Sequence, residues 1–388
     1  MRIAGIIAEY VPFHRGHAWH VEETRRRSGC DYVVACVDGH FTQRGEPTPF
    51  SRWQRARMAL RCGVDAVFEL PTLFAVRTAD VFAASGVAIL GGIGADVLSF
   101  GCETEDMELV CRLTEIRQKE PGSVSEAIQD GLAGGKSHAR ARGDAFADHL
   151  GLPREWINRP NLILGTEYLR AITDQGLLME PLAIRRQGDY HGEQLGEFAS
   201  ATAIRAAFQR GETDAALACL PEAARPYGLP EALHPMDDLL LMALRRMTME
   251  DMAQLPDMGE GLEHRLHRLC RETPGREALL TALKCKRYTH ARLSRLLTHA
   301  LLGFSRETLA AHPMPRYAKL IGIRQGAEPL LKELSSRSTL PIIANPVRLK
   351  GDPVFELECS ATDIWSLLHD APELRAAGRE LRERFVSV

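Results

Sequence analysis

Short apolar runs alternate with helical patterns over the first hundred residues. Four runs have the length and continuity of buried parallel strands, at residues 3–8, 32–37, 66–70 and 97–100. Between them, apolar residues recur at helical spacing over residues 19–27, 53–62 and 80–90. This alternation predicts a parallel sheet with helices on both faces, which is a Rossmann-like α/β fold.

Strand patterns become sparse after residue 101. Helical patterns predominate from there, and one further strand-like run at 181–185 precedes a helix expected over 202–210. The helices expected before that run cover residues 105–119, 123–132, 136–150 and 161–172. Beyond Gly211 the pattern is almost entirely helical. A chain of 388 residues favours two domains. We therefore expect an α/β domain over residues 1–210 and a mostly α-helical domain over residues 211–388.

Composition and charge narrow the class of protein. A formal net charge of −3 excludes a basic coat over the whole molecule, although it leaves room for a local basic patch. Nine cysteines without a CxxC pair favour reduced thiols over a disulfide framework or a zinc–cysteine site. The N-terminal residues do not resemble a leader, and no apolar run reaches the ~20 residues of a membrane helix. We expect a cytoplasmic protein without a membrane partner.

Two histidines follow the first predicted strand in the stretch His14-Arg15-Gly16-His17. The first N–H groups of a helix lack internal partners, so a strand-to-helix junction attracts anions. Gly16 has no Cβ, which lets a phosphate or a base approach the backbone. Two imidazoles can donate to the oxygens of an α-phosphate as charge develops on them. We therefore predict that His14 and His17 are catalytic in a nucleotidyl-transfer step.

A zinc site is a rival interpretation, because His14, His17 and His20 are spaced by three. Positions six apart on a helix diverge, and no cysteine or carboxylate cluster in the sequence completes a tetrahedral set. We therefore expect no bound metal at these histidines.

A second motif, Ser200-Ala201-Thr202-Ala203-Ile204-Arg205, opens the helix expected near residue 202. Ser200 and Thr202 can cap that helix, and Arg205 offers a planar fork of donors suited to phosphate. In isolation the pattern fits an ordinary cap with a solvated arginine. Its position after the histidine motif favours phosphate binding.

These two motifs resemble the HxGH nucleotidyltransferase superfamily, and longer segments resemble its tRNA(Met) cytidine acetate ligase family. The segments that carry the resemblance are 5–17 (GIIAEYVPFHRGH), 41–47 (FTQRGEP), 69–71 (ELP), 100–103 (FGCE), 159–168 (RPNLILGTEY), 286–289 (KRYT) and 361–365 (ATDIW). The sequence departs from the family where Val11 and Arg15 stand in place of Asn, His40 in place of Asn or Asp, and Arg52 in place of Lys.

The resemblance implies an enzyme that activates acetate with ATP, expected with Mg²⁺, and transfers acetyl to N4 of the wobble cytidine of elongator tRNA(Met). Residues 43–46 are expected to line the same cleft. The ATP site implied comprises Ile7, Ala8, Glu9, Tyr10, Phe13, His14, Gly16, His17, His20, Gly101, Asn161, Arg185, Arg186, Ser200, Thr202 and Arg205. Without the resemblance, Asn161 could equally be a turn residue, and Arg185 and Arg186 a solvated pair.

A basic segment in the helical half suits an RNA backbone. Residues 262–300 hold nine Lys or Arg against three acids, and Tyr288 is available there for base stacking. The tRNA-binding residues expected are Arg265, Arg268, Lys284, Lys286 and Arg287. A solvated helix face explains the charge equally well, and the resemblance favours tRNA. The alternatives are a small-molecule adenylyltransferase of the same superfamily and a non-catalytic RNA-binding protein.

Overall fold

The structure is a computed structural model that describes residues 1–136, 138–157, 159–187, 195–259, 261–285 and 287–388. Its centre is a sheet with the strand order β5-β4-β1-β2-β3-β6-β7, in which β8 pairs with β6. The strands are β1 (Ile3–Ala8), β2 (Tyr32–Asp38), β3 (Ala66–Leu70), β4 (Val97–Cys102), β5 (Glu180–Arg185), β6 (Ala318–Ile323), β7 (Ile342–Ile343) and β8 (Val386–Ser387). Strands β1 to β5 are parallel to one another, which confirms the predicted α/β fold.

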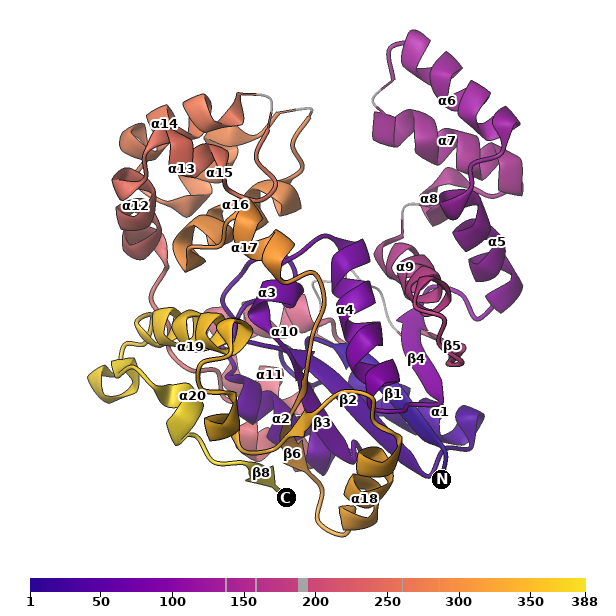
Figure 1. Cartoon of the computed structure of the whole chain (residues 1–388), viewed down its shortest axis with the longest axis vertical. Helices are drawn as coiled ribbons and strands as arrows, with labels where there is room; N and C mark the ends of the chain where they lie inside the picture. Colours follow the sequence, from indigo (N-terminus) through magenta and orange to yellow (C-terminus); the bar gives the residue numbers. More distant parts are fainter. Residues whose placement is uncertain (137, 158, 188–194, 260, 286) are drawn as a thin grey trace.

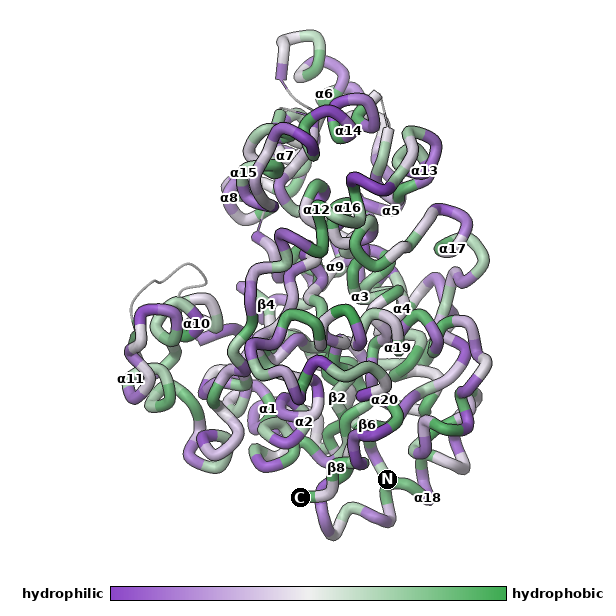
Figure 2. Tube along the Cα trace, turned by 90° about the vertical axis from the view of Figure 1, so that its left-hand side faces the viewer, coloured by the Kyte–Doolittle hydropathy of each residue, from purple (hydrophilic) through white to green (hydrophobic). Residues whose placement is uncertain are grey.

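Both faces of the central sheet are buried. Along β1, Ile3 and Ile7 belong to one hydrophobic core, whereas Ala4 and Ile6 belong to the other, because successive side chains of a strand point to opposite faces. One face is covered by α1 (Arg15–Ser28), α2 (Arg52–Arg61), α10 (Ala201–Gln209), α11 (Thr213–Ala218) and η1 (Glu222–Tyr227). The other is covered by α3 (Thr72–Ala75), α4 (Ala79–Gly92) and α9 (Pro160–Asp174). Figure 2 shows hydrophobic residues concentrated around the sheet.

The strand order reverses direction between β1 and β4. From β1 the chain moves outward through β2 and β3, and it then returns to place β4 and β5 on the opposite side of β1. In open α/β sheets the crevice for ligands lies at such a reversal, beyond the carboxyl ends of the strands. The histidine motif follows β1 and Gly101 lies near the end of β4, so both meet at this crevice.

Two groups of helices stand on the same side of the sheet in Figure 1. The first lies between β4 and β5 in sequence and contains α5 (Met107–Gln118), α6 (Gly122–Ala133), α7 (His138–Leu150) and α8 (Arg154–Ile157). The second contains α12 (Asp237–Arg246), α13 (Met249–Ala253), α14 (Leu262–Glu272), α15 (Arg276–Leu283), α16 (His290–Leu302) and α17 (Arg306–Ala311). We call α12–α17 the helical lobe.

The chain returns to the sheet after the helical lobe. Strand β6 pairs antiparallel with β3, and β7 and β8 pair parallel with β6. The helices of this stretch are α18 (Glu328–Arg337), η2 (Pro346–Leu349), α19 (Pro353–Ser366), η3 (Pro372–Arg375) and α20 (Arg379–Arg382). The expectation of an almost entirely helical chain beyond Gly211 is therefore wrong for residues 318–323, which complete the sheet of the N-terminal half.

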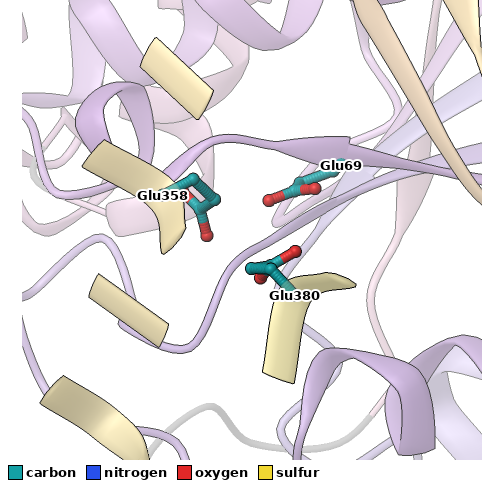
Figure 3. Close-up of side chains that lie close together, drawn as sticks. All are labelled: Glu69, Glu358 and Glu380. Carbon is teal, nitrogen blue, oxygen red and sulfur yellow. The ribbon is translucent and has the colours of Figure 1, made fainter. Parts of the chain in front are cut away.

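A buried ion cluster holds this C-terminal stretch against the sheet. Figure 3 shows Glu69 of β3, Glu358 of α19 and Glu380 of α20 converging, with one carboxylate oxygen of each within 4.8 Å of the others. Arg52 pairs with all three, and the Nζ of Lys319 lies 2.7 Å from Glu69 and 2.5 Å from Glu380. The carboxylates therefore face cations of the chain itself. Arg52 uses its planar fork to bridge several carboxylates at once.

Candidate active site

A cavity of about 330 Å³ opens at the carboxyl ends of β1 and β4, a size within the usual range for small-molecule sites. Most of the residues predicted to bind ATP line it. They are Ile7, Ala8, Glu9, Tyr10, His14, Gly16, His17, His20, Gly101, Asn161, Arg186, Ser200, Thr202 and Arg205. The structure thus brings the two sequence motifs, nearly 190 residues apart by their numbering, into one site.

Two of the predicted residues that the structure describes, Phe13 and Arg185, do not line the cavity. Phe13 is fully buried and packs against Tyr10, with ring centroids 4.7 Å apart. Arg185 is exposed at the end of β5, and its backbone N–H donates to Glu105. Side chains alternate along an extended chain, so Ile184 and Arg186 face the cavity and Arg185 points elsewhere. Phe13 therefore packs behind the motif, and Arg185 lies outside the lining of the cavity.

His14 and His17 cap the helix that carries them. The Nδ1 of His14, the N-cap residue of α1, accepts from the Gly16 N–H at 3.1 Å, and the Nδ1 of His17 accepts from the His14 N–H at 3.2 Å. The two rings stack with centroids 3.7 Å apart. Because each Nδ1 accepts from a backbone N–H, each neutral ring carries its proton on Nε2. Both histidines thus retain one N–H donor, on Nε2.

Burial keeps these imidazoles neutral. Burial, together with the charges of Arg186 and Arg205, lowers the pKa of His14 to about 3. Burial also lowers the pKa of His17, again with help from Arg186, and that of His20 to about 4. A neutral Nε2–H donor stabilises charge that develops on a phosphate oxygen without itself transferring a proton.

Gly16 has a local role that the sequence reasoning did not foresee. A Cβ at this position would lie 3.0 Å from Cε1 and 3.1 Å from Nδ1 of His14. Any larger residue would therefore press on the ring that Gly16 itself holds through its N–H. The absence of a side chain at Gly16 fixes the His14 imidazole in addition to leaving room for a ligand.

Polar side chains from three other elements complete the site. Asn161, in the first turn of α9, donates through its amide to Glu103 at 2.9 Å and accepts from Arg186 at 3.2 Å. Arg205 of α10 donates to the Val11 carbonyl at 2.7 Å, which ties the second motif to the first. The Ser200 hydroxyl caps α10 by accepting from Ala203 at 3.1 Å. Arg186 and Arg205 thus bring two guanidinium groups to the histidine pair.

The loop of residues 42–46 also lines the cavity, as expected from its position after β2. Thr42, Gln43, Arg44 and Glu46 contribute to the lining, and the Gln43 N–H donates to Oε1 of Glu9 at 2.9 Å. Sequence reasoning missed the apolar wall of the cavity, which includes Phe82, Phe100, Leu164 and Tyr168. Leu164 and Tyr168 stand four apart on α9, which is the ordinary spacing of a core face, so the sequence carried no signal that they border a ligand site.

The basic segment of the helical lobe divides into internal and exposed residues. Arg276 donates to Ser294 at 2.6 Å, Arg292 donates to the Asp257 carbonyl at 2.7 Å, and Arg295 pairs with Asp257 at 3.1 Å. Arg265 donates to the Ala282 carbonyl. Arg268, Lys284 and Arg287 are exposed, Arg268 beside Glu272 at 2.8 Å, and Lys286 lies outside the described residues.

Tyr288 does not offer a stacking surface, contrary to the expectation. Its side chain is buried, and its hydroxyl donates to the Gly259 carbonyl at 2.9 Å. Arg292 lies over its ring, 4.8 Å from the centroid. The Tyr288 ring is therefore part of the packing inside the helical lobe.

No helix in the described ranges combines the length and the apolar character that crossing a membrane requires.

Comparisons with known proteins all match nucleotidyltransferases and their relatives over nearly the whole chain. The model of the HIGH Nucleotidyl Transferase family matches residues 1–380. A Bacillus subtilis (strain 168) protein named tRNA(Met) cytidine acetate ligase is 33% identical over 389 residues, covering 96% of this chain and 94% of the relative. A protein of the same name from Geobacillus sp. (strain WCH70) is also 33% identical and covers 96% of each chain.

Solved structures agree with these sequence matches. The crystal structure of Thermotoga maritima TmcAL bound with alpha-thio ATP is similar to this fold with a TM-score of 0.88 and 29% identity, and the match covers 100% of both chains. Its apo form has a TM-score of 0.91 at 28% identity, again over 100% of both chains.

Proposed function

Because this chain belongs to the tRNA(Met) cytidine acetate ligase family of HIGH nucleotidyltransferases, we propose that it joins acetate to a tRNA cytidine at the expense of ATP. The observation that carries the proposal is the neutral, backbone-held pair His14 and His17, which faces a cavity shared with Arg186 and Arg205. The crystal structure of the similar Thermotoga maritima protein with alpha-thio ATP supports a nucleotide as the ligand of that cavity.

The first step activates the carboxylate of acetate. An oxygen of acetate attacks the α-phosphorus of ATP, the bond to the β-phosphate oxygen breaks, and pyrophosphate leaves with the bonding electrons. Negative charge grows on the non-bridging oxygens, where the Nε2–H groups of His14 and His17 donate. Arg186 and Arg205 add positive charge on the same side of the cavity. The product is acetyl-adenylate. Its AMP group leaves the acetyl carbon far more readily than an oxide ion would leave free acetate.

Mg²⁺ fits this cavity as a companion of ATP. The described lining offers mainly N–H donors, which bind phosphate oxygens and cannot ligate a cation, and the carboxylates among the described lining residues are Glu9 and Glu46. Mg²⁺ keeps most of its waters and is commonly held through substrate phosphates, and such a lining suits that mode. The bound ion would supply charge neutralisation at the departing pyrophosphate.

The second step brings in the RNA. We propose that elongator tRNA(Met) is the acceptor, that N4 of its wobble cytidine takes the acetyl group, and that the reaction takes place in the cytoplasm with tRNA. The names of the relatives support tRNA(Met). Exposed basic residues of the helical lobe, among them Arg268, Lys284 and Arg287, are suited to the phosphate backbone.

Acetate-dependent exchange of labelled pyrophosphate into ATP tests the first step. The proposal predicts exchange only when protein, ATP, Mg²⁺ and acetate are all present. Exchange that does not depend on acetate but requires a phosphorylated metabolite would instead identify a small-molecule adenylyltransferase. An absence of exchange with every carboxylate, together with tight tRNA binding, would identify a non-catalytic RNA-binding protein.

A further inference from the structure

The cavity contains a carboxylate that the adenylation step does not use. Both organic substrates of that step, ATP and acetate, are anions, and the imidazoles and guanidinium groups of the lining suit them. Glu9 stands immediately after β1 and lines the same cavity. A carboxylate repels both anions, and the proposed Mg²⁺ is held through phosphates and waters. The place of Glu9 therefore calls for a partner that is neutral or becomes positive during the reaction.

The transfer step supplies such a partner, if the proposed function holds. When the exocyclic amine N4 of cytidine attacks the acetyl carbonyl, the nitrogen gains positive charge and must lose a proton. Arginine cannot accept that proton. His14 and His17 use Nδ1 to hold backbone N–H groups and present Nε2–H, a donor. Their lowered pKa values also make them poor proton acceptors. The Nε2 of His20, a third imidazole of the lining, is engaged with the Ser99 hydroxyl at 3.0 Å, and burial lowers its pKa. Among the described lining residues the carboxylates of Glu9 and Glu46 remain.

Glu9 is held in place more firmly than a surface carboxylate. Its Oε1 accepts from the Gln43 N–H at 2.9 Å, and its carbonyl accepts from Arg55, a fully buried residue, at 2.5 Å. The next residue, Tyr10, has a left-handed φ of 53° and is almost fully buried, with its ring centroid 4.9 Å from that of His17. These contacts fix both the backbone and one carboxylate oxygen, as a general base requires.

From these contacts we propose that Glu9 is the general base of acetyl transfer, which accepts the proton of the cytidine amine. The N4 lone pair forms the N–C bond to the acetyl carbon, and the bond from that carbon to the phosphate oxygen breaks. AMP leaves with the bonding electrons, the N4 proton passes to the Glu9 carboxylate, and Glu9 later releases it to water. Atoms and charges balance without a further reactant.

A single-turnover experiment tests this role. Protein is loaded with labelled acetate and ATP, small molecules are removed, and unmodified tRNA is added. Hydroxylamine, which attacks acetyl-adenylate without needing a base, measures how much adenylate each sample holds. Glu9→Gln keeps an oxygen for the Gln43 N–H and removes the proton acceptor. The rate constant for transfer to tRNA, counted per loaded adenylate, should fall by about 10²-fold or more.

Glu46→Gln is the matched comparison, because it neutralises the other lining carboxylate, and its loss of transfer rate should be much smaller. Transfer at the wild-type rate in Glu9→Gln, or a larger loss in Glu46→Gln, overturns the proposal. Failure of Glu9→Gln to form any hydroxylamine-reactive adenylate also overturns it and assigns Glu9 to the first step. If loaded wild-type protein transfers nothing to tRNA, the proposed function itself fails, a result distinct from these.

Discussion

The Thr298 hydroxyl of α16 donates to the carbonyl of Gly45 at 2.5 Å and so ties the helical lobe to the loop that lines the cavity. The neighbouring Ser294 hydroxyl donates to the Arg44 carbonyl at the same distance. A Cβ on Gly45 would lie 2.7 Å from the Thr298 hydroxyl oxygen and 3.1 Å from the Arg295 backbone. Helix α16 of the helical lobe therefore also sets the position of the loop that lines the cavity.

Gly45→Ala should displace this loop. Its Cβ meets α16, and the loop lines the cavity through Gln43, Arg44 and Glu46. We expect kcat/KM for acetyl-adenylate formation to fall about tenfold or more, because small misplacements around a reacting centre are costly. Gly303→Ala is the control: Gly303 has a similar φ of 70°, against 78° at Gly45, but nothing within 4 Å of its Cβ position. Both variants carry left-handed strain of about 1–2 kcal/mol, so an equal loss of activity would show that strain alone matters.

Removal of either His14 or His17 should abolish adenylation. The variants His14→Ala and His17→Ala each delete one of the donors that we propose for the α-phosphate, and such a loss typically costs a factor of about 10² or more in rate. His14→Asn separates two roles, because Asn still caps the helix but lacks the Nε2–H. We expect His14→Asn to restore thermal stability without restoring pyrophosphate exchange. Near-normal exchange in a folded double alanine variant would contradict the assignment.

Stability should fall on acidification below about pH 6.5. Burial lowers the pKa of several histidines, which therefore stay neutral in the folded protein: His14, His17, His20, His40 and His299. Between about pH 6.5 and pH 4 the unfolded chain binds more protons than the folded one, so the free energy of unfolding rises with pH in that window. Each histidine can add a slope of up to about 1.4 kcal/mol per pH unit. Urea unfolding at pH 5 and pH 7 measures the difference in the free energy of unfolding, to which all these histidines contribute.

One histidine can be tested individually. His40 is fully buried, lies against Arg52 and stacks on Trp365. His40→Asn should therefore reduce the slope of the free energy of unfolding against pH by the contribution of one histidine. His264→Asn, at a position 74% exposed, is the control and should leave the slope as it is in the wild type. Glu358 works in the opposite sense, because burial raises its pKa to about 7. A free energy of unfolding that rises as pH falls from 7 to 5 would contradict the dominance of the histidines.

Two variants should separate adenylation from RNA binding. Arg205→Ala removes a guanidinium from the cavity and the contact with the Val11 carbonyl, so it should impair adenylation far more than tRNA affinity. The double variant Lys284→Ala/Arg287→Ala should do the reverse. Each phosphate contact that it loses should reduce the slope of log affinity against log salt by roughly 0.7–0.9. Wild-type tRNA affinity across a salt series in the double variant would show that these residues are only a solvated face.

The sequence predicted the central sheet well because buried parallel strands leave a simple signal. The runs at β1 and β3 were predicted to the residue. Helix α1 was predicted to start at residue 19 but begins at Arg15, because His14 acts as an N-cap, a role usually filled by Ser, Thr, Asp or Asn. Strand β6 was missed because Lys319 interrupts its apolar run, and the partners that permit a buried lysine, Glu69 and Glu380, lie far away in sequence.

For the site, the sequence predicted most of the motif residues that meet in the cavity, but not how they are supported. The residue types and the order of the motifs at residues 14–17 and 200–205 indicated phosphate binding. The contact of Thr298 with Gly45 joins positions 253 residues apart, and no local pattern signals such a pairing. Tyr288 illustrates the converse: an aromatic residue among basic ones suggested RNA stacking, yet packing within the helical lobe buries it.

Transfer of labelled acetate to tRNA is the decisive measurement of the proposed activity. Purified protein is incubated with ATP, Mg²⁺, labelled acetate and unmodified tRNA(Met), and the tRNA is digested to nucleosides. We expect label to appear as N4-acetylcytidine only when ATP is present, and to disappear when His14 and His17 are both replaced by alanine. Label that enters tRNA without ATP, or a failure of the wild-type protein to label tRNA at all while it still exchanges pyrophosphate, would contradict this expectation.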